Sequence, residues 1–166
     1  MTLSNDVLKA IPTARSYGAM VTVVPGVNTN LNDVVSGTAT TQFPIHGGRN
    51  NEGRLMIDGL NIGNPPGGNQ PASYIADVGN AQEVTFTTAG GLGESETAGL
   101  VMNVVPKTGG NSTTGSVAYS GSGEALQSDN YTDELKAQGL TTPIPLTKVY
   151  DLNGAVGGPI MKDRIW

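Results

Sequence analysis

Three segments of the chain alternate apolar residues with small or polar ones, a pattern that predicts β-strands. They are Glu83 to Thr88 (EVTFTT), Gly115 to Gly121, and Lys148 to Gly158. A period of two places successive side chains on opposite faces of a sheet. Two further runs, Leu100 to Val105 and Arg54 to Leu60 (RLMIDGL), are rich in apolar residues and also predict strands.

The N-terminal segments predict short helices. SNDVLKAIP and SYGAMVTVVPGV each begin at a serine, Ser4 or Ser16, which is a favoured N-cap residue, and each contains a proline that ends a helix. A brief strand, TQFPIHG, should pair with RLMIDGL through the Gly-Gly-Arg-Asn-Asn turn between them. The first ~110 residues therefore predict an α+β fold, a small mixed sheet with short helices.

The pattern changes after Gly110. The two later alternating segments flank a mostly polar connection of about two dozen residues, which is longer than a compact domain usually allows. Strands of an outer-membrane β-barrel have such long connections, and they alternate lipid-facing with lumen-facing residues. On this interpretation Tyr150, Leu152 and Val156 face lipid, whereas Asp151 and Asn153 face water.

Composition excludes several classes of function. Among 166 residues there are 24 Gly and 10 Pro, only 14% are charged, and the net charge is -5. This favours a turn-rich chain without a basic stripe, so we expect no nucleic-acid partner. The chain has no Cys and a single His, which excludes disulfides, thiolate sites and a two-His zinc site. We expect neither a metal nor a cofactor.

Motifs of enzymes are incomplete. Gly110 to Ser116 (GNSTTGS) has the glycine spacing of a phosphate loop but lacks its lysine. His46 has no serine or cysteine in a nucleophile-elbow context. Glu94 and Glu96 form a carboxylate pair, but in a glycine-rich loop such a pair is more often solvated. The sequence therefore predicts that the chain is not an enzyme.

Four blocks occur in a fixed order along the chain. They are VVPGV (23–27), FPIHGGRNNEGRLMIDGLNI (43–62), AQEVTFTTAGGLGESETAGLVMNVVPKTGGNSTTGSVAYS (81–120) and NGAVGGPIMKDRIW (153–166). In this order and spacing they resemble the plug domain of a TonB-dependent outer-membrane receptor, followed by the start of its barrel. More narrowly, they are similar to the Oar-like group.

The resemblance implies a fold and a function. Residues 3–110 would form the plug, a small α+β unit held inside a barrel of about 22 strands, and residues 111–166 would form the first strands of that barrel. The implied function is transport of a scarce nutrient such as a siderophore, oligosaccharide or peptide. The plug blocks the pore, and TonB pulls on it across the periplasm. The implied partners are TonB, the transported ligand and the rest of the barrel, in the outer membrane of a Gram-negative-type bacterium.

The resemblance also implies roles for single residues. Arg49 and Arg54 lie where related plugs use arginine to pair with barrel carboxylates and lock the pore, although siderophore receptors have Arg-Gly where this chain has Gly-Gly-Arg. The loops 63–72 and 89–96 would face outward, either solvated or touching the ligand. Their ligand-contact candidates are Asn64, Asn69, Glu94 and Glu96. Tight turns of the central sheet would depend on Gly47, Gly48, Asp58 and Gly59.

The chain departs from the family pattern in three places. No TonB box precedes Leu3, the carboxypeptidase-regulatory-like domain of many Oar-like proteins is missing, and the chain stops at Trp166 where the family continues with two phenylalanines. Since two barrel strands cannot close, we expect a fragment or a truncated product. The alternative is an extracellular Gly/Thr-rich β module for adhesion or ligand binding. Strands continuing after Trp166 and a signal peptide upstream would favour the receptor.

Overall fold

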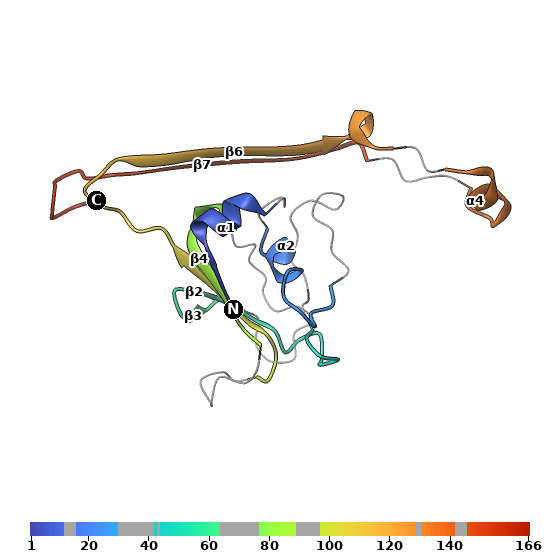
Figure 1. The fold of residues 1–166 in the computed structure, drawn as a ribbon, viewed down its shortest axis with the longest axis horizontal. Helices are drawn as coiled ribbons and strands as arrows, with labels where there is room; N and C mark the ends of the chain where they lie inside the picture. The colour runs from blue at the N-terminus through green and yellow to red at the C-terminus, as the bar shows by residue number, and fades with distance from the viewer. Residues whose placement is uncertain are drawn as a thin grey trace.

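The structure is a computed structural model that describes residues 1–11, 16–29, 42, 44–63, 77–88, 97–128, 131–141 and 146–166. These residues form a small unit of sheet and helices, called here the sheet unit (residues 1–106), and a long two-stranded hairpin that runs beside it (Figure 1).

The sheet unit is built on five strands in the order β1-β4-β5-β2-β3. Their bounds are Thr2–Ser4 (β1), Arg54–Ile57 (β2), Leu60–Asn61 (β3), Ala81–Thr87 (β4) and Val101–Pro106 (β5). Strands β2 and β5 pair in parallel, and the other neighbours pair antiparallel. The predicted α+β fold with a mixed sheet is therefore confirmed.

Two short helices cover one face of this sheet. Helix α1 spans Asn5–Ala10 and helix α2 spans Tyr17–Val21, as the serine and proline signals predict. At α2 the Ser16 hydroxyl accepts a hydrogen bond from the Ala19 amide at 3.1 Å, which satisfies one of the unpaired donors of the first turn. Ser4 has the extended backbone of an N-cap at α1, without a side-chain hydrogen bond.

The core lies between these helices and the inner face of β4 and β5. Val84 of β4 and Met102 of β5 are fully buried in one hydrophobic core with Tyr17 and Met20 of α2. Each fully buried side chain of this size stabilises the fold by about 1.5–3 kcal/mol. The alternation of buried and half-exposed positions in β4 and β5 follows the period of two seen in the sequence.

The predicted pairing of TQFPIHG with RLMIDGL is wrong. Strand β2 pairs with β3 and β5 instead, and Ile45 forms only an isolated bridge with Val27. Phe43 lies outside the described residues. The turn between the two segments carries a left-handed residue at His46, followed by Gly47. The parallel β2–β5 contact joins residues far apart in the sequence, so no local pattern marks it.

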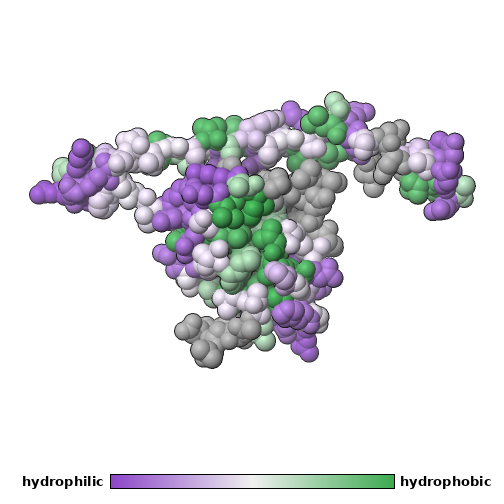
Figure 2. Space-filling view, viewed as in Figure 1, coloured by the Kyte–Doolittle hydropathy of each residue, from purple (hydrophilic) through white to green (hydrophobic). Residues whose placement is uncertain are grey.

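The hairpin consists of β6 (Thr114–Gly123) and β7 (Lys148–Gly157), paired antiparallel from Thr114↔Gly157 to Gly123↔Lys148. Burial alternates along both strands. Val117 and Val156 are 82% and 84% exposed, whereas their neighbours Ser116 and Ala155 are half-buried. The two strands and their alternation are as the sequence predicts. Figure 2 shows hydrophobic side chains on the hairpin surface turned away from the sheet unit.

The connection between β6 and β7 contains structure that the sequence reasoning missed. A 3-10 turn, η2 (Glu124–Leu126), follows β6, and a short helix, α4 (Asp133–Ala137), lies at the far tip of the hairpin (Figure 1). Thr132 caps α4 by accepting a hydrogen bond from the Leu135 amide at 3.4 Å. Lys136 pairs with Asp133 at 2.8 Å, and its ammonium lies 4.9 Å from the ring centre of Tyr131.

Candidate functional site

Arg54 is buried inside the sheet unit. Arg54 is 1% exposed, and its guanidinium Nη1 donates to the carbonyl oxygens of Asn51 and Gly53, both at 2.9 Å. Its backbone amide donates to the Leu100 carbonyl at 2.8 Å, at the beginning of the parallel β2–β5 pair. Because a buried cation must be solvated by the protein itself, these carbonyls replace water around Arg54.

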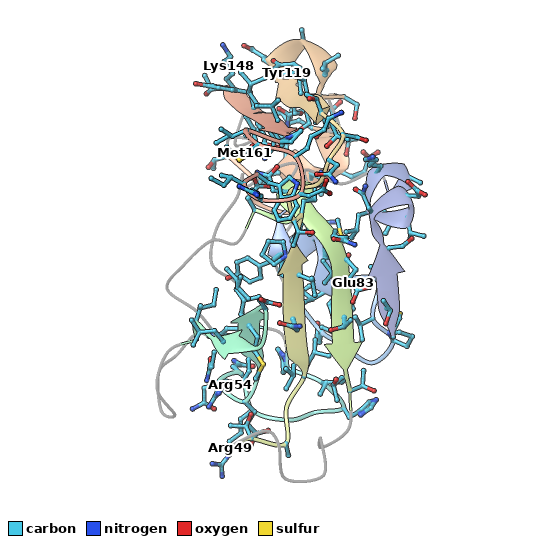
Figure 3. All side chains as sticks on the ribbon, turned by 90° about the vertical axis from the view of Figure 1, so that its left-hand side faces the viewer. Arg49, Arg54, Glu83, Tyr119, Lys148 and Met161 are labelled. Carbon is cyan, nitrogen blue, oxygen red and sulfur yellow. The ribbon has the colours of Figure 1, made fainter. Side chains whose placement is uncertain are left out.

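Arg49 is exposed, in contrast. Its backbone amide donates to the Glu52 carboxylate at 3.3 Å, which closes the turn that leads into β2. Figure 3 shows Arg49 and Arg54 at the end of the sheet unit opposite to the hairpin residues Tyr119 and Lys148. The hairpin therefore does not supply partners for these arginines.

The predicted turn residues lie in two tight turns. Asp58 (φ 49°) and Gly59 (φ 79°) connect β2 to β3 as a two-residue loop, and positive φ at both positions is what a type I′ hairpin turn requires. Gly47 has φ 76° in the other turn. Gly48 serves a different purpose, since a Cβ there would lie 3.0 Å from the Ile45 carbonyl oxygen and from the Glu52 carboxylate.

The ligand-contact candidates lie outside the described residues. This applies to Asn64, Asn69, Glu94 and Glu96, and to most of the two loops that carry them. Their predicted role stays a prediction.

One contact between the sheet unit and the hairpin was not foreseen. The 3-10 turn η1 (Val78–Asn80) precedes β4, and Asp77 caps it by accepting from the Gly79 amide at 2.8 Å. The other oxygen of the Asp77 carboxylate accepts from the Asn80 side-chain amide at 3.0 Å and from the side-chain amide of Asn153 in β7. The Asp-Val-Gly-Asn sequence is a recognisable turn signal, but nothing local links it to Asn153.

The linker from β5 to β6 (residues 107–113) is tied at both of its ends. At its start, Lys107 donates through its amide to the Asn80 carbonyl at 3.0 Å and through its ammonium to the Gly79 carbonyl at 3.1 Å. Near its end, the side-chain oxygen Oδ1 of Asn111 accepts from the Asp163 backbone amide at 2.9 Å and from the Trp166 indole at 3.1 Å. The turn after β7 therefore folds back onto the linker.

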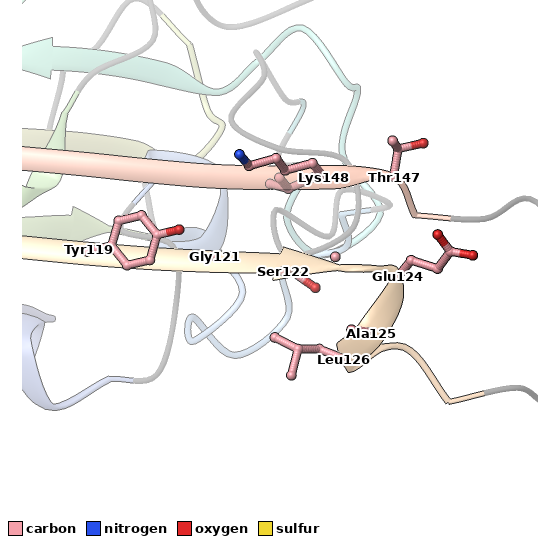
Figure 4. Close-up of a pocket in the computed structure, with 10 residues that line it drawn as sticks. Tyr119, Gly121, Ser122, Glu124, Ala125, Leu126, Thr147 and Lys148 are labelled. Atoms are coloured by element: carbon pink, nitrogen blue, oxygen red, sulfur yellow. The ribbon is translucent and has the colours of Figure 1, made fainter.

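Two hollows accompany the hairpin. One, of about 850 Å³, lies between the sheet unit and the hairpin and is lined by Lys9, Asn80 and Lys107 on one side and by Ser116 and Ala155 on the other. The second, of about 660 Å³, lies at the η2 end of the hairpin and is lined by Tyr119, Leu126 and Lys148 among others (Figure 4). The first hollow shows that small side chains on the inner hairpin face leave space beside the sheet unit.

The described residues offer few groups for metal binding or acid–base catalysis. They include no group of three His, Asp or Glu residues that could hold a metal ion. The pKa of Glu134, in the first turn of α4, is lowered by hydrogen bonds to its carboxylate from its own backbone amide and then from the Thr132 side chain. In the described part of the chain, no helix is long and apolar enough to cross a membrane.

A small mixed sheet with two short helices, joined by a tied linker to a strand pair with one exposed apolar face, is the arrangement that the four sequence blocks led us to expect. The comparisons with known proteins agree. The chain is 27% identical over 153 residues to the TonB-dependent transporter Oar of Myxococcus xanthus, an alignment that covers 92% of this chain. No family model matches the chain.

Solved structures share the fold. The siderophore receptor PirA from Acinetobacter baumannii matches 98% of this chain with a TM-score of 0.64 at 19% identity. The outer membrane transporter YddB from Escherichia coli matches 88% with a TM-score of 0.64 at 15% identity. The resemblance predicted from the four sequence blocks is therefore confirmed. The chain spans 13% of the length of the Oar transporter and 22% of the PirA chain.

Proposed function

We propose that this chain is the gate and the first wall hairpin of a TonB-dependent receptor that takes up a scarce nutrient across the outer membrane. The sheet unit serves as the plug, with a boundary near residue 110, and β6 and β7 begin the barrel wall. The likeness to a named transporter and to receptor structures favours transport over catalysis.

The observation that carries this proposal is the two-faced hairpin. Val117, Tyr119, Tyr150, Leu152 and Val156 are between 63% and 84% exposed on one face. The face turned to the sheet unit carries small or polar side chains apart from Val149. In water such an apolar face is costly, whereas a lipid bilayer favours it and leaves the polar face to the lumen. Ten-residue strands also have the length that crossing a bilayer requires.

The two arginines fit different parts of this function. Arg49 is exposed at the end of the plug away from the hairpin, so it is placed to meet carboxylates on wall strands outside this chain. Arg54 is held inside the plug by two carbonyls. We therefore propose Arg49 as the arginine of the lock and Arg54 as the residue that shapes the turn presenting it.

The lock role is tested in the receptor that contains this chain. If Arg49 pairs with a wall carboxylate inside the lumen, its ion pair is worth more than the ~0–1 kcal/mol of an exposed pair. Arg49→Ala should then loosen the plug and admit vancomycin, which a closed receptor excludes. Unchanged vancomycin sensitivity at normal expression removes the lock role but leaves the transport function standing.

The transport role itself is tested through its energy source. Cells that depend on this receptor for growth on a limiting nutrient should lose that growth when TonB is deleted. Growth that persists without TonB removes the proposed function.

A further inference from the structure

Between the sheet unit and the hairpin lies a small set of polar contacts that none of the sequence motifs accounts for. Asp77 precedes η1 and lies on the surface of the sheet unit, and Asn153 projects from the inner face of β7. The side-chain amide of Asn153 donates to the Asp77 carboxylate. Their separation of 76 residues makes this a contact between two parts of the fold.

The Asp77 carboxylate is well placed as an anchor. Its two oxygens accept three hydrogen bonds, from the Gly79 amide at 2.8 Å, from the Asn80 side chain at 3.0 Å and from Asn153. The first two fix the carboxylate in position before Asn153 arrives, so little side-chain entropy is lost in the contact. A hydrogen bond to an ionised acceptor is also stronger than one between neutral groups.

The surroundings of Asn153 favour its contact with Asp77. Ala155, next to it on the inner face of β7, and Ala118, across from it on β6, have side chains too short for such a bond. On the opposite side, a Cβ at Gly79 would lie 3.1 Å from Cγ of Asn153. The turn therefore approaches β7 closely because position 79 has no side chain.

The same turn is attached to the rest of the plug. Lys107 holds the carbonyls of Gly79 and Asn80 at the start of the linker, and Asp77 forms an antiparallel bridge with Ser16, the buried cap of α2. A displacement of Asp77 would therefore act on the linker and on α2 together.

We propose that Asp77 and Asn153 form a latch between the plug and the first wall hairpin, which keeps the gate closed and opens when the plug moves. This rests on the proposed function and adds to it a contact on the side of the plug away from Arg49. Both residues are positioning residues, since neither is placed against a ligand.

The test uses vancomycin entry into cells that express the receptor containing this chain. Asn153→Asp places a second carboxylate against Asp77 and removes the donor, so entry should rise roughly tenfold, as expected for the loss of one hydrogen bond to a charged group. The matched control is Asp151→Asn, on the same face of β7, where the described part of the chain offers no hydrogen-bond partner. Entry in the control should stay at the level of the unmodified receptor.

A second variant separates latch function from folding. The distance of 3.1 Å at Gly79 matches the roughly 3 Å between a Cβ and the partner sulfur in a disulfide. In the double variant Gly79→Cys with Asn153→Cys, the reduced receptor should leak and the oxidised one should be sealed again. The unmodified chain contains no cysteine among its 166 residues. Formation of the cross-link shows that the two positions adjoin in the folded receptor, so leakage that complete oxidation does not change cannot be assigned to misfolding.

The possible results distinguish a failure of the latch from a failure of the proposed function. Failure of the cysteines to cross-link, equal leakage before and after complete oxidation, or Asn153→Asp that leaks no more than Asp151→Asn overturns the latch. A receptor without residues 1–106 provides the reference for an open pore. If that receptor admits no vancomycin, the proposed function fails and the latch with it. If it admits vancomycin while the latch variants do not, only the latch fails.

Discussion

At the scale of residues, the two arginines of one short segment have different environments. Arg54 is 1% exposed and donates to two carbonyls, whereas Arg49 is exposed. Arg54→Ala leaves those carbonyls without their donor and opens a cavity beside β2, so it should lower the free energy of unfolding by about 2–4 kcal/mol. Arg49→Ala should change it by less than about 0.5 kcal/mol. Urea unfolding of the full chain measures both, and equal losses would contradict the difference in environment.

The turn between β2 and β3 offers a test of backbone strain without a change in packing. Gly59 has φ 79°, and a Cβ there would meet no atom within 4 Å. Gly59→Ala should therefore cost about 1–2 kcal/mol, all of it from the left-handed backbone. Gly154, in β7, also has open space around a Cβ but no positive φ. Gly154→Ala should leave stability almost unchanged in the same unfolding experiment, and a similar loss at both positions would refute the strain argument.

The stability of helix α4 should depend on pH through the carboxylate of Glu134. Hydrogen bonds from its own backbone amide and from Thr132 lower its pKa below the ordinary value of 4.5. A lowered pKa in the folded state means that ionised Glu134 stabilises α4 above pH 4.5, and this contribution is lost as the pH falls through the lowered pKa. NMR signals of Asp133–Ala137 should therefore shift toward random coil under acid. The replacement Glu134→Gln should abolish that part of the shift.

At the scale of elements, the sequence predicted what local patterns can encode. Period-two alternation located β4, β6 and β7, and the serine and proline signals located α1 and α2. The features that it did not predict are contacts over long separations. The strand β1, the parallel β2–β5 pair and the contact of Asp77 with Asn153 depend on tertiary packing, for which a single sequence carries no periodic signal.

In the candidate site, too, local features could be predicted from the sequence and features that depend on tertiary packing could not. The turn glycines could be located because positive φ restricts the choice of residue, as at Gly47 and Gly59. The burial of Arg54 could not, since a segment with two arginines and no helical or strand period gives no reason to bury one of them. Residue type was enough to predict where the tight turns lie, but only the folded structure shows that Arg54 is buried and Arg49 is exposed.

The hairpin and the sheet unit should differ in stability. In the sheet unit β4 and β5 are covered by α1 and α2, whereas in the chain alone β6 and β7 form a two-stranded ribbon whose apolar side chains are exposed. Isolated ribbons are marginally stable in water. Amide hydrogen exchange of the full chain should therefore be at least about tenfold faster in β6 and β7 than in β4 and β5. Equal protection would contradict their loose attachment.

At the scale of the whole molecule, the proposed function makes the hairpin a boundary between two environments. Its inner face contacts the sheet unit through Asn153, and its outer face carries side chains such as Val117 and Tyr119 that the sheet unit leaves exposed. An extracellular adhesion module would place both faces in water or against protein. A receptor wall strand and an adhesion module therefore differ in whether adjacent residues of one strand face lipid and lumen in turn.

The most direct measurement is spin-label accessibility at Ser116 and Val117, in outer-membrane vesicles from cells that express the receptor containing this chain. These neighbours lie on opposite faces of β6, half-buried and 82% exposed respectively. With Val117→Cys labelled, collisions with dissolved oxygen should be frequent and collisions with a water-soluble nickel complex rare, as in lipid. With Ser116→Cys labelled, collisions with the nickel complex should be more frequent than at position 117 and collisions with oxygen rarer, because Ser116 lines the hollow between the hairpin and the sheet unit. A label at position 117 that meets the nickel complex as freely as a label in water would contradict the account.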